Sequence, residues 1–141
     1  MHFTHNKKIE LIQNSKRIVG IDIAKHVHYA TFLQPDGKEL KIGIKIKNNR
    51  KGFDLLKKNL KGIEKKRVIV GMEPTGHYWK SIAYYLKEDG YQVVIVNPYH
   101  VKLSKEIRDN RNSKNDSIDS QLIAHLVQEG KFGKELLPHG N

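Results

Sequence analysis

Asp22 is the residue whose position in this chain most strongly indicates chemistry. It lies in the apolar run RIVGIDIAK, residues 17–25, where Val19, Ile21 and Ile23 are typical of a strand buried on both faces. A buried carboxylate without a partner is very costly, so such groups are normally paired, protonated or bound to a metal ion. Asp22 is therefore either at the exposed end of the strand, where it caps a turn, or a metal ligand at the centre of a sheet. The second interpretation requires further ligands from elsewhere in the chain.

Three other acids stand where they would supply those ligands. Glu73 ends the apolar run of residues 67–72, and Pro74 forces the chain out of the sheet directly after it. Asp116 and Asp119 open a predicted helix at positions i and i+3, so they share a face. Each acid also has a simpler interpretation, as a helix cap or as the partner of a lysine. Together with Asp22 they form an oxygen-rich set that suits Mg²⁺ or Mn²⁺, and a pair of such ions activates a nucleophile and stabilises a leaving oxygen at phosphorus.

The chain is strongly basic. Its 141 residues include 26 Lys and Arg against 15 Asp and Glu, which gives a net charge of +11. A domain this basic attracts polyanions, of which nucleic acid is the usual one. The cations are mostly lysines spread along the chain, which indicates contact with a phosphate backbone rather than readout of bases. A lysine-rich surface that only confers solubility is the alternative.

Length and composition exclude several other classes of protein. The length fits one domain, and no apolar run approaches the roughly 20 residues of a membrane span. Residues 1–8 lack the apolar segment of a secretory signal. The absence of cysteine excludes disulfides and thiolate metal sites and is compatible with a reducing compartment. We therefore expect a cytoplasmic protein without a membrane partner.

The hydrophobic pattern predicts an α/β domain. Residues 1–15 are polar and predict a flexible arm, residues 16–132 the domain, and residues 133–141 a tail. Strands are expected at residues 17–23, 27–33, 39–46, 67–72 and 92–96, and helices at residues 49–60, 78–88, 99–107 and 116–129. Outward lysines mark the third strand as an edge strand. Two hairpins followed by strand-helix-strand units predict a mixed five-stranded sheet with helices on both faces and the first strand at its centre, which is the ribonuclease H-like layout.

A family resemblance rests on four segments that occur in order. They are VGIDIAK at residues 19–25, EPTGHYW at 73–79, NP at 97–98 and KNDSID at 114–119. These segments resemble the N-terminal domain of the DEDD transposases, insertion-sequence recombinases related to the Piv DNA invertase, over about residues 17–132. The resemblance implies a RuvC-like domain with Mg²⁺ or Mn²⁺ as cofactor. It implies that the catalytic and metal-binding acids are Asp22, Glu73, Asp116 and Asp119.

The resemblance also implies partners, namely DNA, a structured bridge RNA that pairs with donor and target DNA, and further copies of the chain. Family members are considerably longer, and their C-terminal domain carries the serine to which attack on the phosphodiester is attributed. That domain is absent from these residues, and Ser113, Ser117 and Ser120 are expected to be turn and helix-surface residues rather than nucleophiles. We therefore expect this domain to bind metal and nucleic acid without completing recombination alone.

Five residues near the acids are candidate nucleic-acid contacts: Lys25, Thr75, Arg108, Arg111 and Lys114. The basic residues around the late acid pair could neutralise a scissile phosphate, although a solvated loop explains them equally well. Thr75 and the following glycine predict a tight turn before a helix, where backbone amides can hold a phosphate.

Alternatives from other classes stay open at this point. An actin-like or sugar-kinase ATPase lobe also begins with a Gly-Ile-Asp-Ile strand, but it needs a Gly- or Thr-rich phosphate loop where residues 24–27 read AKHV. ATP binding would identify it. A non-catalytic nucleic-acid-binding module, in which the acids only cap and pair, would not bind metal. A stand-alone resolvase of RuvC type would cleave DNA junctions without other domains.

Overall fold

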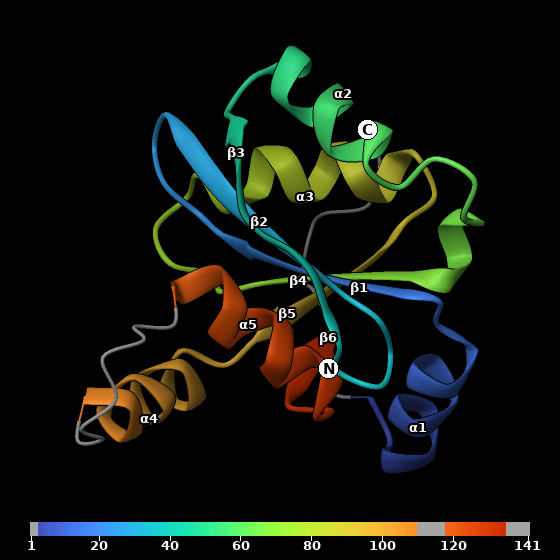
Figure 1. Ribbon diagram of the computed structural model, residues 1–141, viewed down its shortest axis with the longest axis vertical. Helices are drawn as coiled ribbons and strands as arrows, with labels where there is room; N and C mark the ends of the chain where they lie inside the picture. Colours follow the sequence, from blue (N-terminus) through green and yellow to red (C-terminus); the bar gives the residue numbers. More distant parts are fainter. Residues whose placement is uncertain (1–2, 110–117, 135–141) are drawn as a thin grey trace.

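The chain forms a six-stranded mixed sheet, which the computed structural model describes together with its helices over residues 3–109 and 118–134. The strand order is β3-β2-β1-β4-β5-β6 (Figure 1). The strands are β1 (Arg17–Asp22), β2 (Val27–Leu33), β3 (Glu39–Lys47), β4 (Val68–Met72), β5 (Gln92–Val96) and β6 (Phe132–Lys134). β1, β4 and β5 run parallel, whereas β2, β3 and β6 join as antiparallel neighbours. This arrangement is a ribonuclease H-like α/β fold.

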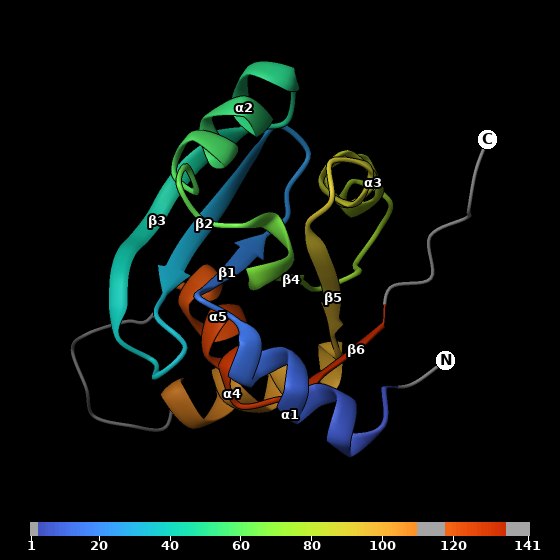
Figure 2. The same cartoon turned by 90° about the vertical axis from the view of Figure 1, so that its right-hand side faces the viewer.

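Helices cover both faces of the sheet. They are α1 (His5–Asn14), α2 (Arg50–Lys58), α3 (Trp79–Glu88), α4 (Pro98–Asp109) and α5 (Asp119–Gln128), with a short 3₁₀ turn at Lys65–Arg67. Figures 1 and 2 show α2 and α3 on one side of the sheet and α1, α4 and α5 on the other. The fold is therefore a three-layer sandwich with a core on each side of the sheet.

Alternation along β1 divides its side chains between those two cores. Val19 and Ile21 are fully buried in the core beneath α2 and α3, whereas Ile18 is fully buried in the core on the α5 side. Asp22 follows with the same parity as Ile18, so its side chain is on the α5 face of the sheet. The strand is continuous and apolar because both of its faces are buried.

Close packing of α5 on the sheet depends on small residues. Gly20 and Gly71 are neighbours in the β1–β4 register. A Cβ atom on Gly20 would lie 2.6 Å from Ala124 Cα and from the Ser120 carbonyl oxygen, so only glycine lets the backbone of α5 approach this strand. Thr31 continues the same line into β2, where its hydroxyl binds Ser120 on α5. Gly20, Thr31 and Gly43 of β3 are called the glycine row below.

β3 lies at one edge of the sheet, opposite β6, and is irregular. Its register with β2 shifts between Ala30 and Phe32 and again between Phe32 and Leu33. Gly43 has a positive φ of 63°, which glycine adopts without strain, and its backbone N–H donates to Thr31 Oγ1 at 3.1 Å. Leu40 and Ile42, the apolar side chains at these shifts, are 40% and 48% exposed.

The predicted strand order is confirmed, with β1 central, β2 and β3 on one side and β4 and β5 on the other. The strand count was wrong, because β6 adds a sixth strand beside β5. Phe132 anchors this strand in the α5-side core at 4% exposure. A three-residue strand with one apolar side chain carries no alternating pattern, so the sequence gives no signal for it.

The N-terminal segment also differs from the expected loose arm, because the structure has a helix, α1, over His5–Asn14. The Thr4 side chain caps it by accepting a hydrogen bond from the Lys7 backbone N–H at 3.1 Å. Leu11 and Ile12 pack against the α5-side core. Those tertiary contacts stabilise a segment whose polar composition alone does not favour a helix.

Candidate metal and phosphate site

Two of the predicted acids lie side by side at the carboxyl ends of the central parallel strands. Ile21 of β1 is the register partner of Met72 of β4, so Asp22 and Glu73, one residue further along each strand, are next to each other. Both side chains are partly buried. The Thr75 N–H donates to the Glu73 carbonyl at 2.9 Å in the tight turn that leads away from β4. The sheet therefore places two carboxylates at one edge of its parallel centre.

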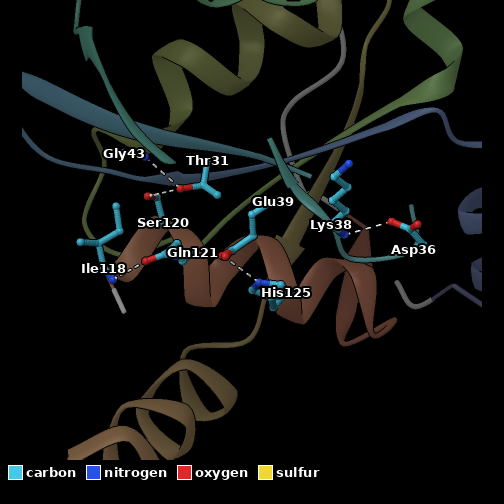
Figure 3. Close-up of polar contacts among 9 residues, drawn as sticks. All are labelled: Thr31, Asp36, Lys38, Glu39, Gly43, Ile118, Ser120, Gln121 and His125. Atoms are coloured by element: carbon cyan, nitrogen blue, oxygen red, sulfur yellow. Dashed lines mark hydrogen bonds and ion pairs between the residues drawn. The ribbon is translucent and has the colours of Figure 1, made fainter. Parts of the chain in front are cut away.

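A third acid reaches the same place from α5. Asp119 is the first residue of that helix, which begins directly after Ile118, whose backbone is extended. The Ile118 N–H donates to Gln121 Oε1 at 2.9 Å, which satisfies an amide at the helix start. Ser120 Oγ and Thr31 Oγ1 share a buried hydrogen bond of 2.7 Å (Figure 3). These contacts fix the first turn of α5 against β2 and so fix the position of Asp119.

Further along the helix, Glu39 of β3 ties α5 to the edge strand. Gln121 Nε2 donates to Glu39 Oε2 at 2.8 Å, and His125 Nε2 donates to the same oxygen at 3.1 Å (Figure 3). The hydrogen bond from Gln121 is the main reason that the pKa of Glu39 is lowered. α5 is thus held to the sheet over two turns.

Burial and neighbouring negative charge raise the pKa values of Asp22 and Glu73. Burial raises the pKa of Asp22, and the nearby Asp119 charge raises it further. Burial also raises the pKa of Glu73; Lys105 acts in the opposite direction, and the charges of Asp22 and Asp119 add to the rise. Clustered, half-buried carboxylates that repel one another would be stabilised by a cation between them.

Two cations of α4 are aimed at this cluster. Lys105 Nζ lies 3.1 Å from Asp119 Oδ2, and Arg108 Nη1 lies 3.6 Å from Asp119 Oδ1. The Lys105 charge also offsets part of the rise in the pKa values of Asp22 and Glu73, so it acts on all three acids. The site therefore combines carboxylates with positively charged hydrogen-bond donors.

The structure separates the predicted site residues into three groups. Asp22, Glu73 and Asp119 come together, and Arg108 lies beside them. Lys25 and Thr75 are exposed in the loops that follow β1 and β4. The remaining predicted residues lie outside the described part of the chain: Asp116, Arg111 and Lys114. The predicted start of the last helix at Asp116 was wrong, because α5 begins at Asp119 after an extended Ile118.

Lys105 is the residue that sequence reasoning missed. It lies three positions before Arg108 on α4, so the two side chains share a helical face. That spacing was the available signal, since Arg108 was already a candidate. One lysine among many in a basic chain gave no other reason to select it.

Within residues 3–109 and 118–134, no group of three or more Asp, Glu, His or Cys side chains is placed so that it could hold a metal ion. Asp119 is instead paired with Lys105 and Arg108. The donor chemistry nevertheless fits a hard divalent cation, because the clustered side chains offer only carboxylate oxygens.

The fold and the clustered acids define a class of protein, a ribonuclease H-like domain with acids at the ends of its central parallel strands and at the start of the helix packed across them. The family model of DEDD transposases of the IS110 type, described as a transposase, matches residues 19–137. This chain belongs to that transposase family, whose members act on DNA. A search of curated proteins gave no match. None of the described helices is both long and apolar enough to cross a membrane.

Proposed function

We propose that this chain is the metal-dependent catalytic domain of a DEDD transposase, which cleaves and exchanges DNA strands. The observation that carries the proposal is the meeting of Asp22, Glu73 and Asp119, brought from two strands and a helix to one half-buried place. We propose that these three residues, with Asp116, hold Mg²⁺ or Mn²⁺. Family membership supports the reaction class, and the all-carboxylate donor set supports the choice of ion.

When bound, such ions activate a nucleophile and stabilise a leaving oxygen at phosphorus. The residues of the chain have complementary roles. Asp22 and Glu73 come from rigid, buried strands, so their positions are fixed before any ligand binds. Lys105 and Arg108 offset the negative charge of the acids and offer the charged donors that bind phosphate oxygens.

The net charge of +11 supports a polyanionic partner in addition to the phosphate at the acids. We propose that this partner includes a structured bridge RNA as well as DNA, and that the working form is a multimer. Lys25 and Thr75, exposed in the loops beside the acids, are proposed backbone contacts together with Arg111 and Lys114.

A thermal melt with and without Mn²⁺ tests the metal site. A ligand present at 100 times its Kd adds about 2.7 kcal/mol to stability, which for a domain of this size raises Tm by roughly 10 °C. We expect this shift in the wild type and its loss in Asp22→Asn and in Glu73→Gln. Nuclease and strand-exchange assays on the wild type and the same variants then test the reaction.

Glu64→Gln is the matched control. Glu64 is an exposed carboxylate whose partner is Lys66 at 3.7 Å, and it precedes the 3₁₀ turn instead of facing the acid cluster. This variant should keep the full Mn²⁺ shift. A wild type that does not respond to Mn²⁺, alone or with DNA added, would favour a non-catalytic nucleic-acid-binding module.

A further inference from the structure

Beside the acid cluster, the register of the sheet continues a line of side chains toward its open edge. Asp22 is the direct partner of Tyr29 on β2, and Tyr29 is the direct partner of Lys45 on β3. Direct partners in a sheet project from the same face, so all three side chains are on the face that carries α5. Glu73, beside Asp22, extends the line in the other direction. Glu73, Asp22, Tyr29 and Lys45 are called the acid row below.

The acid row is the first line of this face that the body of α5 leaves uncovered. The glycine row, two residues back along each strand, receives the first turn of the helix through Ser120 and Ile118. Because α5 begins there and runs away from the acids, Tyr29 is only partly buried and Lys45 is exposed. A track of two side chains, Tyr29 and Lys45, therefore leads from the acids across β2 to the β3 edge of the sheet.

The chemistry of this track suits a nucleic-acid strand. Tyr29 offers a phenol ring for stacking and a hydroxyl for a phosphate oxygen. Among the described residues Lys45 makes no ion pair within 4 Å, so its ammonium group is available for a phosphate. Strand spacing places Tyr29 about 5 Å and Lys45 about 10 Å from Asp22 in the plane of the sheet. A strand whose phosphate lies at the acids would meet both residues.

We propose that Tyr29 and Lys45 form a positioning track for the single DNA strand that enters the carboxylate site. This inference rests on the proposed function, because that function places the reacting phosphate at the acids. Tyr29 stacks on a base next to this phosphate, and Lys45 neutralises a phosphate further along the same strand. Both are positioning residues that set the register of the strand against Asp22 and Glu73.

Fluorescence anisotropy with a labelled single-stranded oligothymidylate of about 16 nucleotides tests the track. We expect Tyr29→Ala to weaken binding about ten-fold and Tyr29→Phe to keep most of the affinity, because stacking supplies most of the contact. Lys45→Gln should weaken binding several-fold. It should also reduce the dependence of log Kd on log salt by about 0.7, the value for one lost phosphate contact on a single strand.

Lys58→Gln is the matched control for Lys45→Gln, because Lys58 is an exposed lysine on α2, against the opposite face of the sheet. If Lys58→Gln changed Kd and the salt slope as much as Lys45→Gln, the effect would be one of net charge and the track would be overturned. An oligouridylate competitor of the same length supplies a second comparison. If the track variants lost affinity for RNA but not for DNA, the assignment to a DNA strand would be overturned.

DNA binding and thermal melts are both measured with and without Mn²⁺ for each variant. The two measurements allow the metal site and the track to be tested independently of each other. Track variants that lose DNA affinity while keeping the Mn²⁺ shift support both. If the wild type shows no Mn²⁺ shift but its DNA binding still depends on Tyr29 and Lys45, the track is supported and the metal site is overturned. A normal Mn²⁺ shift with wild-type DNA binding in all track variants overturns the track alone.

Discussion

The glycine row and the acid row are neighbours on one face of β1, β2 and β3, with Glu73 extending the acid row to the end of β4, and they are built from opposite kinds of residue. Gly20, Thr31 and Gly43 present small or absent side chains, and α5 packs directly on them. Two residues further on, Asp22 and Tyr29 are only partly buried. The change occurs where α5 begins.

This difference shows how a buried strand can end in an acid that is only partly buried. The glycine row brings the backbone of α5 so close that its first turn is fixed, and Asp119 projects from that turn toward the next row. The acids are then partly desolvated by the helix without being covered by it. The packing of α5 on the glycine row therefore determines how far the acids of the acid row are desolvated.

The largest expected effect comes from filling the glycine row. Gly20→Ala would bring a Cβ against the backbone of Ala124 and Ser120, which cannot move aside as a side chain can. We expect a loss of at least about 3 kcal/mol in unfolding free energy, measured by urea denaturation. Gly133→Ala, where a Cβ would have nothing within 4 Å, should change stability by less than about 0.5 kcal/mol. Equal effects in the two variants would contradict the close approach of α5.

A smaller effect should follow from removing the hydroxyl of the glycine row. Thr31→Val keeps the shape of the side chain but leaves Ser120 Oγ and the Gly43 N–H without their partner. Unpaired buried groups cost about 1–3 kcal/mol, so we expect a loss of about 2 kcal/mol in urea denaturation. Ser120→Ala should cost less, because Thr31 keeps its bond from Gly43. The double variant should be less than additive, and full additivity would mean that the two hydroxyls are not coupled.

Next in size is an effect of pH on stability, caused by His28. Its side chain is on the opposite face of β2 from Tyr29 and binds the loop between β1 and β2. The ring is fully buried, and its Nδ1 accepts a hydrogen bond from the Ala24 N–H at 3.1 Å. Burial lowers the pKa of His28 below 6.5, while Asn48 opposes this in part. The folded state binds the proton more weakly than the unfolded state, so this stability is present above about pH 6.5 and is lost as the pH falls toward the lowered pKa.

One such group adds at most about 1.4 kcal/mol per pH unit to the slope of stability against pH. Urea denaturation between pH 5 and 8, roughly the range in which histidine titrates, should show this slope in the wild type and a flatter profile in His28→Leu. His5→Gln, which changes an exposed ring in α1, should keep the wild-type profile. An unchanged profile in His28→Leu would mean that another group causes the acid sensitivity.

The smallest effect on stability should come from the exposed contact between Glu39 of β3 and α5, called the rim contact here. Glu39→Gln replaces the exposed carboxylate that accepts from Gln121 and His125. Exposed contacts of this kind are worth about 1 kcal/mol or less, so Tm should fall by no more than about 4 °C. A fall as large as that of Thr31→Val would show that the rim, and not the buried hydroxyl pair, holds the helix start.

Sequence patterns were sufficient for the centre of this fold. The apolar run around Asp22 and the one that ends at Glu73 predicted buried neighbouring strands, and the observed register brings their ends together. Lysines alternating along β3 predicted an edge strand, which the strand order confirms. These features depend on burial and charge, which can be inferred from the types and spacing of neighbouring residues.

Features that depend on tertiary contact could not be predicted in this way. α1 is stabilised by Leu11 and Ile12 against a distant core, and β6 is held chiefly by Phe132. Lys105 acts on the acids only because α4 packs near α5, which no periodicity encodes. The start of α5 at Asp119 depends on the long-range hydrogen bond between Ser120 and Thr31.

The two register shifts in β3 have a consequence for self-association. A regular edge strand presents an unbroken series of backbone donors and acceptors on which another chain can add a strand and begin aggregation. In β3 that series is interrupted beside Leu40 and Ile42, the exposed apolar residues that would otherwise favour such pairing. Lys41 and Lys45 add like charge along the same edge. The bulge that accommodates Thr31 and Gly43 thus also protects the β3 edge of the sheet from the addition of a further strand.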